Sequence, residues 1–240
     1  VVIAAASVVV GGASLAWAFA RITPPGTLRL RPGLPAAVAA RGMLTFAFLG
    51  ADAFVALALT DVRHTSTRFA GMVLSSAAIT WTAGSWISAR SIASAGPRRL
   101  VSIGMMVVVA GIVAMAVVVS TSVSPWFAVG AWLLGGLGVG LAYSPLSQAV
   151  IAAAEPAQLG AATAALQLSD VLGVALGSGL GGALVAIADR REVRIDGSTV
   201  QAGVTMVWVI TAAMGLIGVV AASRMSRYLP NAERTRSAQA

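Results

Sequence analysis

The stretch QLSDVLGVALGSGLGGALVAI, residues 167–187, holds a single carboxylate in an otherwise uncharged apolar run with recurring glycines. At about 100° per residue, one face of a helix carries Asp170 and four neighbours: Gln167, Gly173, Gly177 and Gly181. Glycines at every fourth position let a second helix approach closely, and a charge on that face is kept away from lipid. The pattern predicts a membrane-spanning helix that packs against protein on the Asp170 face.

The composition of the chain is typical of a membrane protein. Hydrophobic residues make up 58% of the 240 residues and charged residues only 10%, whereas soluble domains carry about a quarter charged residues. The net charge of +8 comes from arginines between apolar runs, which indicates topology signals rather than nucleic-acid binding. Cysteine is absent and histidine occurs once, so we expect no disulfide, metal centre or cofactor.

Uncharged apolar runs long enough to cross a bilayer recur along the chain. A bilayer core of about 30 Å needs roughly 20 helical residues. Seven such runs lie near residues 1–20, 42–60, 69–89, 100–119, 126–152, 158–187 and 200–222. The sequence therefore predicts an all-α, polytopic membrane helix bundle with seven transmembrane helices.

The distribution of arginine predicts the orientation of these spans. Eleven arginines fall in the segment 21–41, in the loop after the third run and in the tail after residue 222. The remaining five lie on the opposite side, where four acidic residues dilute them. The positive-inside rule places the first set in the cytoplasm. We therefore expect a multi-pass protein of the cell membrane with a cytoplasmic C-terminus.

Three segments resemble transporters of the major facilitator superfamily. The segment TWTAGSWISARSIASAGPRRLVSIG, 80–104, resembles the loop between the second and third helices of each half of that fold. The matching positions are Gly84, Arg90, Gly96, Arg98 and Arg99, while Ser88 stands at the acidic position. The runs at 135–150 and 155–177 look like the tenth and eleventh helices of the drug/proton antiporters of this superfamily.

The resemblance implies an organisation for the whole chain. Residues 1–20 would be the last helix of the N-terminal half, 21–41 the central cytoplasmic loop, 42–222 the six-helix C-terminal half and 223–240 a cytoplasmic tail. The chain would then be a fragment of a proton-coupled efflux transporter for a small amphipathic molecule. Its partners would be that substrate, protons, the bilayer and the missing N-terminal half. The glycine face of the eleventh helix would meet the opposite half.

Two carboxylates within predicted spans are the main candidates for chemistry. Asp52 lies eleven residues from Arg41 and nine from Asp61, hence near the middle of its span. A carboxylate at that depth is expensive, so a functional or paired role is the default interpretation. Asp52 and Asp170 each bind a proton or substrate, or each forms a hydrogen bond that only fixes packing. The sequence leaves both alternatives open.

Other candidates follow from the resemblance and from helix packing. The tenth helix should line the transport pathway, which suggests cavity positions near the Pro145 break: Tyr143, Ser147 and Gln148, with Gln167 on the next helix. The run GGLGVG at 135–140 lacks the spacing and the strand of a nucleotide loop, so Gly136 and Gly140 are interpreted as close-packing positions. Arg90, Arg98 and Arg99 either form a latch that changes partners during transport or serve only as topology signals.

Two function classes compete with transport. A membrane scaffold or subunit would need no ionisable residue inside a span, so Asp52 and Asp170 argue against it. An intramembrane enzyme would need a nucleophile and base or metal ligands at depth. Without cysteine, and with no histidine in a span, only an aspartyl pair of Asp52 and Asp170 could serve it. The sequence therefore predicts a transporter rather than an enzyme.

Overall fold

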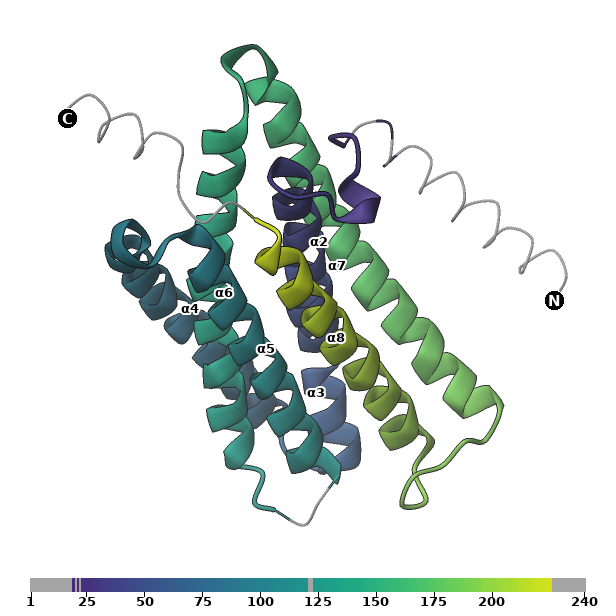
Figure 1. Ribbon diagram of the computed structural model, residues 1–240. Coiled ribbons are helices and arrows are strands. Elements are labelled where there is room, and N and C mark those ends of the chain that lie inside the picture. Colours follow the sequence, from purple (N-terminus) through teal and green to yellow (C-terminus); the bar gives the residue numbers. More distant parts are fainter. Residues whose placement is uncertain (1–18, 20, 22, 121–122, 226–240) are drawn as a thin grey trace, which may run out of the picture.

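Six long helices are formed by the residues that the computed structural model describes, which are 19, 21, 23–120 and 123–225 (Figure 1). They are α2 (Leu34–Asp52), α4 (Thr67–Ala95), α5 (Pro97–Ser120), α6 (Phe127–Ala153), α7 (Leu159–Arg190) and α8 (Thr199–Ser223). The short elements are η1 (Thr27–Arg29), α3 (Val55–Leu57), the π-helical turn η2 (Ala58–Val62) and η3 (Pro156–Gln158). The predicted all-α bundle is confirmed, while the first predicted span, 1–20, lies outside the described residues.

Helix α2 occupies the centre of the bundle. It packs against α6, α7 and α8, whereas α5 contacts α6 and α8. Helix α4 contacts mainly α6 and therefore lies at one edge (Figure 1). The central place of α2 explains its small buried residues Ala36, Ala37 and Ala40, because small side chains let neighbouring helices approach.

Five helices of the described chain are long and apolar enough to cross a membrane: α2 continued through η2, α5, α6, α7 with η3, and α8. Helix α4 does not qualify, so the predicted count of seven spans is not confirmed. Its 29 residues suffice in length, but serine and threonine interrupt the apolar pattern of the predicted span 69–89. Hydroxyls such as those of Ser76 and Thr82 donate to carbonyls one turn earlier, which satisfies them within the helix.

Helix α2 begins eight residues before the predicted start of its span at residue 42. Gly33 precedes it with φ of 92°, in the left-handed region that favours glycine, and Pro35 stands in the first turn. The prediction that 21–41 is entirely loop is therefore wrong for residues 34–41. Arg41 is a helical residue with 3% of its side chain exposed, because the apolar sequence LPAAVAA before it extends the helix.

The same helix is interrupted directly after Asp52. Ala53 and Phe54 form a turn, after which the chain resumes as α3 and η2. The sequence predicts an uninterrupted span over 42–60, and neither glycine nor proline marks the break. Helix breaks and π-turns recur at functional sites of membrane transporters, where neighbours satisfy the freed backbone groups.

The glycine face of α7 packs against α2. A Cβ at Gly177 would lie 2.7 Å from the carbonyl oxygen of Phe46 and 3.0 Å from Cα of Gly50. Gly173 lies against the Gly42 carbonyl and Thr45, and Gly181 lies against the ring of Phe54. The expectation that this face meets the opposite half of a transporter is wrong for these glycines. Glycines on both α2 and α7 allow close approach, so the stripe is covered within this bundle.

Glycines of α6 make the corresponding contacts with α4. Gly136 lies against the carbonyl oxygen of Ala77, and Gly140 lies against that of Trp81. Gly84 of α4 contacts α6 in turn, since a Cβ there would lie 2.5 Å from the carbonyl oxygen of Leu137. Gly84 was expected at a helix end, but it is an interior packing residue eleven positions before the end of α4.

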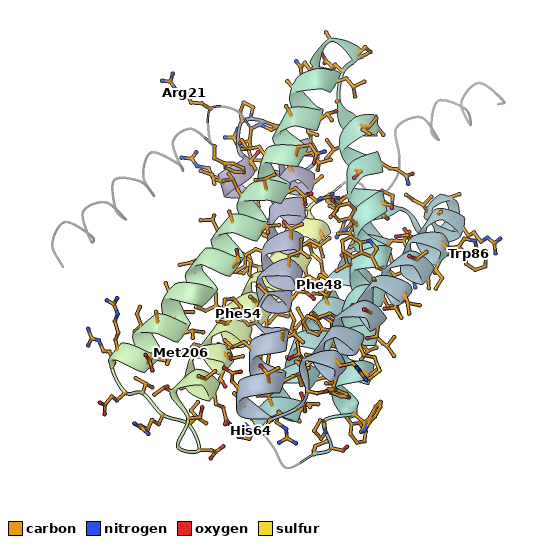
Figure 2. The ribbon with its side chains drawn as sticks, turned by 180° about the vertical axis from the view of Figure 1, so that it is seen from behind. Arg21, Phe48, Phe54, His64, Trp86 and Met206 are labelled. Atoms are coloured by element: carbon orange, nitrogen blue, oxygen red, sulfur yellow. The ribbon has the colours of Figure 1, made fainter. Side chains whose placement is uncertain are left out.

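The predicted loop at 90–99 is a single tight turn. Gly96, with φ of 74°, joins α4 to α5, and Arg98 and Arg99 belong to the first turn of α5. The guanidinium of Arg90 lies 3.5 Å from the ring centroid of Trp86, which projects from the outer edge of α4 (Figure 2). Ion pairs between described residues include none of these three arginines, so the latch stays a prediction.

Candidate functional site

Arg41 and Asp170 form a buried ion pair that joins α2 to α7. Nε of Arg41 donates to Oδ1 of Asp170 at 2.8 Å, and Nη2 donates to Oδ2 at 3.3 Å. The side chains of Arg41 and Asp170 are 3% and 17% exposed, respectively. A two-point contact fixes the orientation of both groups, and each charge compensates the other where water is scarce.

Two residues of α6 complete this network. The hydroxyl of Tyr143 donates to Oδ2 of Asp170 at 2.8 Å, and the Tyr143 ring centroid lies 3.0 Å from Cζ of Arg41. Nη1 of Arg41 donates to the Tyr143 carbonyl at 2.9 Å and to Oγ of Ser147 at 3.3 Å. The cluster of Arg41, Tyr143, Ser147 and Asp170, called the ion-pair cluster below, thus ties three helices together.

Asp52 has a different environment at the break in α2. Its Oδ1 accepts a hydrogen bond of 2.7 Å from the indole Nε1 of Trp132, a fully buried side chain of α6. No described cation forms an ion pair with Asp52. Asp52 also stands directly before the turn that separates α2 from α3. The negative charge of this carboxylate is therefore poorly compensated.

A chain of four aromatic rings, Trp132, Phe48, Trp81 and Tyr143, connects the two carboxylate environments. Trp132 stacks on Phe48 with centroids 5.4 Å apart, Phe48 meets Trp81 edge-on at 6.2 Å, and Trp81 meets Tyr143 at 5.4 Å. Figure 2 places Phe48 in the interior of the bundle. The first and last rings donate hydrogen bonds to Asp52 and Asp170, so this aromatic chain reaches from one carboxylate to the other.

The two carboxylates do not form an aspartyl pair. Asp170 binds Arg41, which lies eleven residues before Asp52 on the same helix, and eleven residues of α-helix span about 16 Å. An aspartyl dyad requires two carboxylates close enough to share a proton. The geometry therefore excludes an aspartyl pair formed by Asp52 and Asp170. In the described chain, no group of three or more His, Asp or Glu side chains could hold a metal ion.

Four of the predicted site residues belong to the two carboxylate environments. Tyr143, Ser147 and Asp170 lie in the ion-pair cluster, and Asp52 lies at the other end of the aromatic chain. Gln148 and Gln167 are exposed on the surface of the described bundle and do not join either environment.

Sequence reasoning missed Arg41 and Trp132. Arg41 was counted as a loop residue, although the apolar residues before it were a signal that the helix starts earlier. For Trp132, no signal in the sequence connects the indole with Asp52, which lies eighty positions away.

No protein-family model matches the chain. Over 184 residues it is 28% identical to proteins of two Mycobacterium tuberculosis strains, each named "Probable multidrug-efflux transporter". The match covers 75% of this chain and 38% of each relative. The chain thus spans well under half the length of these curated relatives.

Solved transporter structures share the arrangement of the helices. A peptide transporter in complex with alafosfalin superposes with a TM-score of 0.61 at 17% identity, covering 86% of this chain and 43% of that one. The inward-open xylose transporter XylE from E. coli gives 0.63 at 18%, covering 80% and 48%. The chain has a major facilitator superfamily transporter fold. Its distant homology to the efflux transporters extends over three quarters of its length.

The major facilitator fold confirms the family resemblance predicted from the motifs at 80–104, 135–150 and 155–177. Within this fold, the ion-pair cluster lies toward the end of the bundle that holds residues 21–33 and the α4–α5 turn (Figure 1). Asp52 lies farther along α2, toward the opposite end. The multi-pass membrane character of the chain is established, while the side of the membrane that each end faces stays a prediction.

Proposed function

We propose that this chain is the C-terminal half of a transporter that exports a small amphipathic molecule in exchange for protons. The fold and the names of the homologous efflux transporters support membrane transport. Two half-bundles would rock about a site near the membrane midplane. Residues 21–33 and the tail would face the cytoplasm, as the arginine distribution indicates.

The observation that carries the proton-coupled mechanism is the environment of Asp52. Its hydrogen-bond partner in the described chain is a neutral indole, and it stands where α2 breaks. Asp52 is half-buried within a membrane span, where a charge without a counter-ion is costly, so taking up a proton removes that cost and releasing it restores the charge. A group of this kind can bind a proton and a cationic amphiphile in turn. The break gives α2 a place to bend between the two states.

The ion-pair cluster takes a different role in this proposal. Protonating Asp170 would break a two-point ion pair and leave Arg41 buried without its counter-ion, which is strongly unfavourable. We therefore assign the cluster to holding α2, α6 and α7 in register. Of the aromatic chain, Trp81 and Tyr143 are half-buried and would offer a π surface to an amphipathic or cationic substrate, whereas Trp132 and Phe48 are enclosed in the core.

The test uses the full-length transporter that contains this chain, reconstituted in proteoliposomes with an imposed pH gradient and a fluorescent cationic dye as substrate. Asp52→Asn keeps the shape and can still accept the Trp132 hydrogen bond, but it carries no titrating proton. We expect loss of pH-driven dye transport with dye binding retained. The matched control is Asp61→Asn, an exposed carboxylate nine residues further on. Unchanged pH-driven transport by Asp52→Asn would refute the role of Asp52.

A second measurement separates transport from a scaffold role. The unmodified full-length protein should transport the dye in exchange for protons that flow down the imposed gradient. Dye transport should stop when that gradient is collapsed. A scaffold or subunit would show no gradient-dependent flux at any dye concentration. If the chain is half of a transporter, the isolated chain should insert into membranes but move no dye, because one wall of the pathway is missing.

A further inference from the structure

An apolar crevice lies between α2, α7 and α8, beside the segment that contains η1. It has a volume of about 360 Å³ and is open to the surroundings. Its apolar lining includes Leu28 and Leu30 from the η1 segment, Met43 and Phe46 from α2, Leu172 from α7 and Met214 from α8. At roughly 30 Å³ for each water-sized group, this volume holds about a dozen such groups. The size and the lining suit one long hydrocarbon chain.

One buried hydroxyl in this crevice has no partner. Ser169 of α7 lines the crevice and is 2% exposed. Its Oγ makes no hydrogen bond with any residue that the structure describes. Its neighbour Asp170 points into the ion-pair cluster, so Ser169 belongs to a different face of α7. Because an unsatisfied buried hydroxyl is costly, Ser169 indicates a ligand with a hydrogen-bond acceptor.

A positively charged hollow adjoins the apolar crevice. It has a volume of about 320 Å³, shares Thr27 and Leu28 with the crevice, and is lined further by Arg29 and Arg31. No acidic side chain of the described chain lines either hollow. The two hollows together therefore combine an apolar slot, a buried hydroxyl without a hydrogen-bond partner and a positively charged mouth.

We propose that this composite site binds an anionic membrane phospholipid. One acyl chain lies in the crevice, an ester carbonyl accepts a hydrogen bond from the Ser169 hydroxyl, and the phosphate lies beside Arg29 and Arg31. A phospholipid fits because the helices that line the crevice are themselves membrane spans, which brings bilayer lipids to its opening. Basic residues at the membrane surface attract anionic headgroups. The site is separate from Asp52 and does not depend on the proposed proton coupling.

The test measures lipid binding directly, by native mass spectrometry of the delipidated full-length protein in mild detergent. The probes are dioleoyl phosphatidylglycerol and dioleoyl phosphatidylcholine, which share acyl chains and differ in net charge. We expect tighter binding of phosphatidylglycerol. Arg29→Gln with Arg31→Gln should weaken it by roughly 10–30-fold, at about threefold to fivefold for each arginine, and leave phosphatidylcholine nearly unchanged. The matched control, Arg98→Gln with Arg99→Gln, removes the same charge at the same end of the bundle and should have little effect.

Two further variants test the crevice. Ala39→Phe fills it from α2 and should weaken the binding of both lipids, while Ser169→Ala should weaken it by roughly threefold to tenfold. Ala39→Leu is the smaller change if Ala39→Phe fails to fold. Equal losses in the two arginine double variants would overturn the headgroup assignment. Unchanged binding in the folded Ala39 variants, or full affinity for glycerol 3-phosphate without acyl chains, would overturn the crevice. None of these readouts requires transport.

Discussion

Asp52 and Asp170 are both carboxylates within membrane-spanning helices, yet their surroundings are opposite. Asp170 faces a cation at 2.8 Å and also accepts a hydrogen bond from a tyrosine. Asp52 has the indole of Trp132 instead, and it stands at the turn between α2 and α3. Removing one partner of a buried ion pair leaves an uncompensated charge, whereas neutralising a lone buried carboxylate removes one. The same side chain therefore belongs to an ion pair that joins two helices at one position, and at the other it is the group to which we assign proton exchange.

The largest effect should follow from breaking the ion pair. Asp170→Asn leaves Arg41 buried without a counter-ion, and we expect the free energy of unfolding to fall by about 3–5 kcal/mol. Arg41→Met should cost a similar amount because it strands Asp170. Combining Arg41→Met with Asp170→Leu removes both charges and should recover most of the loss. Thermal unfolding of the purified full-length variants measures this, and strictly additive losses in the double variant would contradict the pairing.

The glycine contact between α7 and α2 should give the next largest effect. A side chain at Gly177 meets the backbone of Phe46 and Gly50, which cannot move aside cheaply, so Gly177→Leu should destabilise by about 1–3 kcal/mol. Gly179→Leu is the matched control on the same helix, because no atom lies within 4 Å of a Cβ at that position. Ala186→Leu, on an exposed position, should also be mild. Equal melting temperatures for Gly177→Leu and Gly179→Leu would show that the close contact between Gly177 and α2 does not contribute to stability.

Removing the indole donor should have a smaller effect on stability. Trp132→Phe keeps an aromatic ring that can stack on Phe48 but leaves Oδ1 of Asp52 without its donor. We expect a loss of about 1–2 kcal/mol, within the range for an unsatisfied buried polar group. Trp208→Phe is the control, since its buried Nε1 has no hydrogen-bond partner in the described chain. A larger loss in Trp208→Phe than in Trp132→Phe would show that ring volume, not the hydrogen bond, decides the outcome.

The smallest stability effect should come from Asp52→Asn. The amide oxygen can accept the same indole hydrogen bond, and no described cation loses a counter-ion. We expect a change within about 0.5 kcal/mol in either direction, in contrast to Asp170→Asn. Comparing the melting temperatures of the two Asn variants at one pH measures this difference directly. A loss in Asp52→Asn as large as that in Asp170→Asn would mean that Asp52 also has a structural counter-ion.

Local patterns in the sequence predicted the fold, because a membrane helix needs only a long uncharged run and arginines between runs. Five spans follow from that rule. Helix α4 does not, because serines and threonines interrupt its apolar run, and hydroxyls such as those of Ser76 and Thr82 form their hydrogen bonds within the helix. The helix start at Leu34 was missed because Arg41 was interpreted as a loop charge. The break after Asp52 had no local signal, since Ala53 and Phe54 are ordinary helical residues.

The candidate site was predictable only in part for a similar reason. Asp52, Asp170 and Tyr143 are conspicuous as polar residues in apolar runs, so the sequence pointed to them. Their partners depend on contacts between distant segments: Arg41 lies 129 positions from Asp170, and Asp52 lies 80 from Trp132. A single sequence carries no information on such pairings. The direction of the glycine face of α7 was wrong for the same reason, since the small residues of α2 that receive it are far away in sequence.

The central claim is that Asp52, and not Asp170, is the carboxylate that gains and loses a proton. Infrared difference spectroscopy of the full-length protein in a bilayer measures this without a substrate. Protonated carboxyl groups give a separate carbonyl band, so a difference spectrum between an acidic and an alkaline buffer records the carboxyl groups that gain a proton. We predict that Asp52→Asn removes one such band and that Asp170→Asn retains it. A band that survives in Asp52→Asn but disappears in Asp170→Asn would contradict the account.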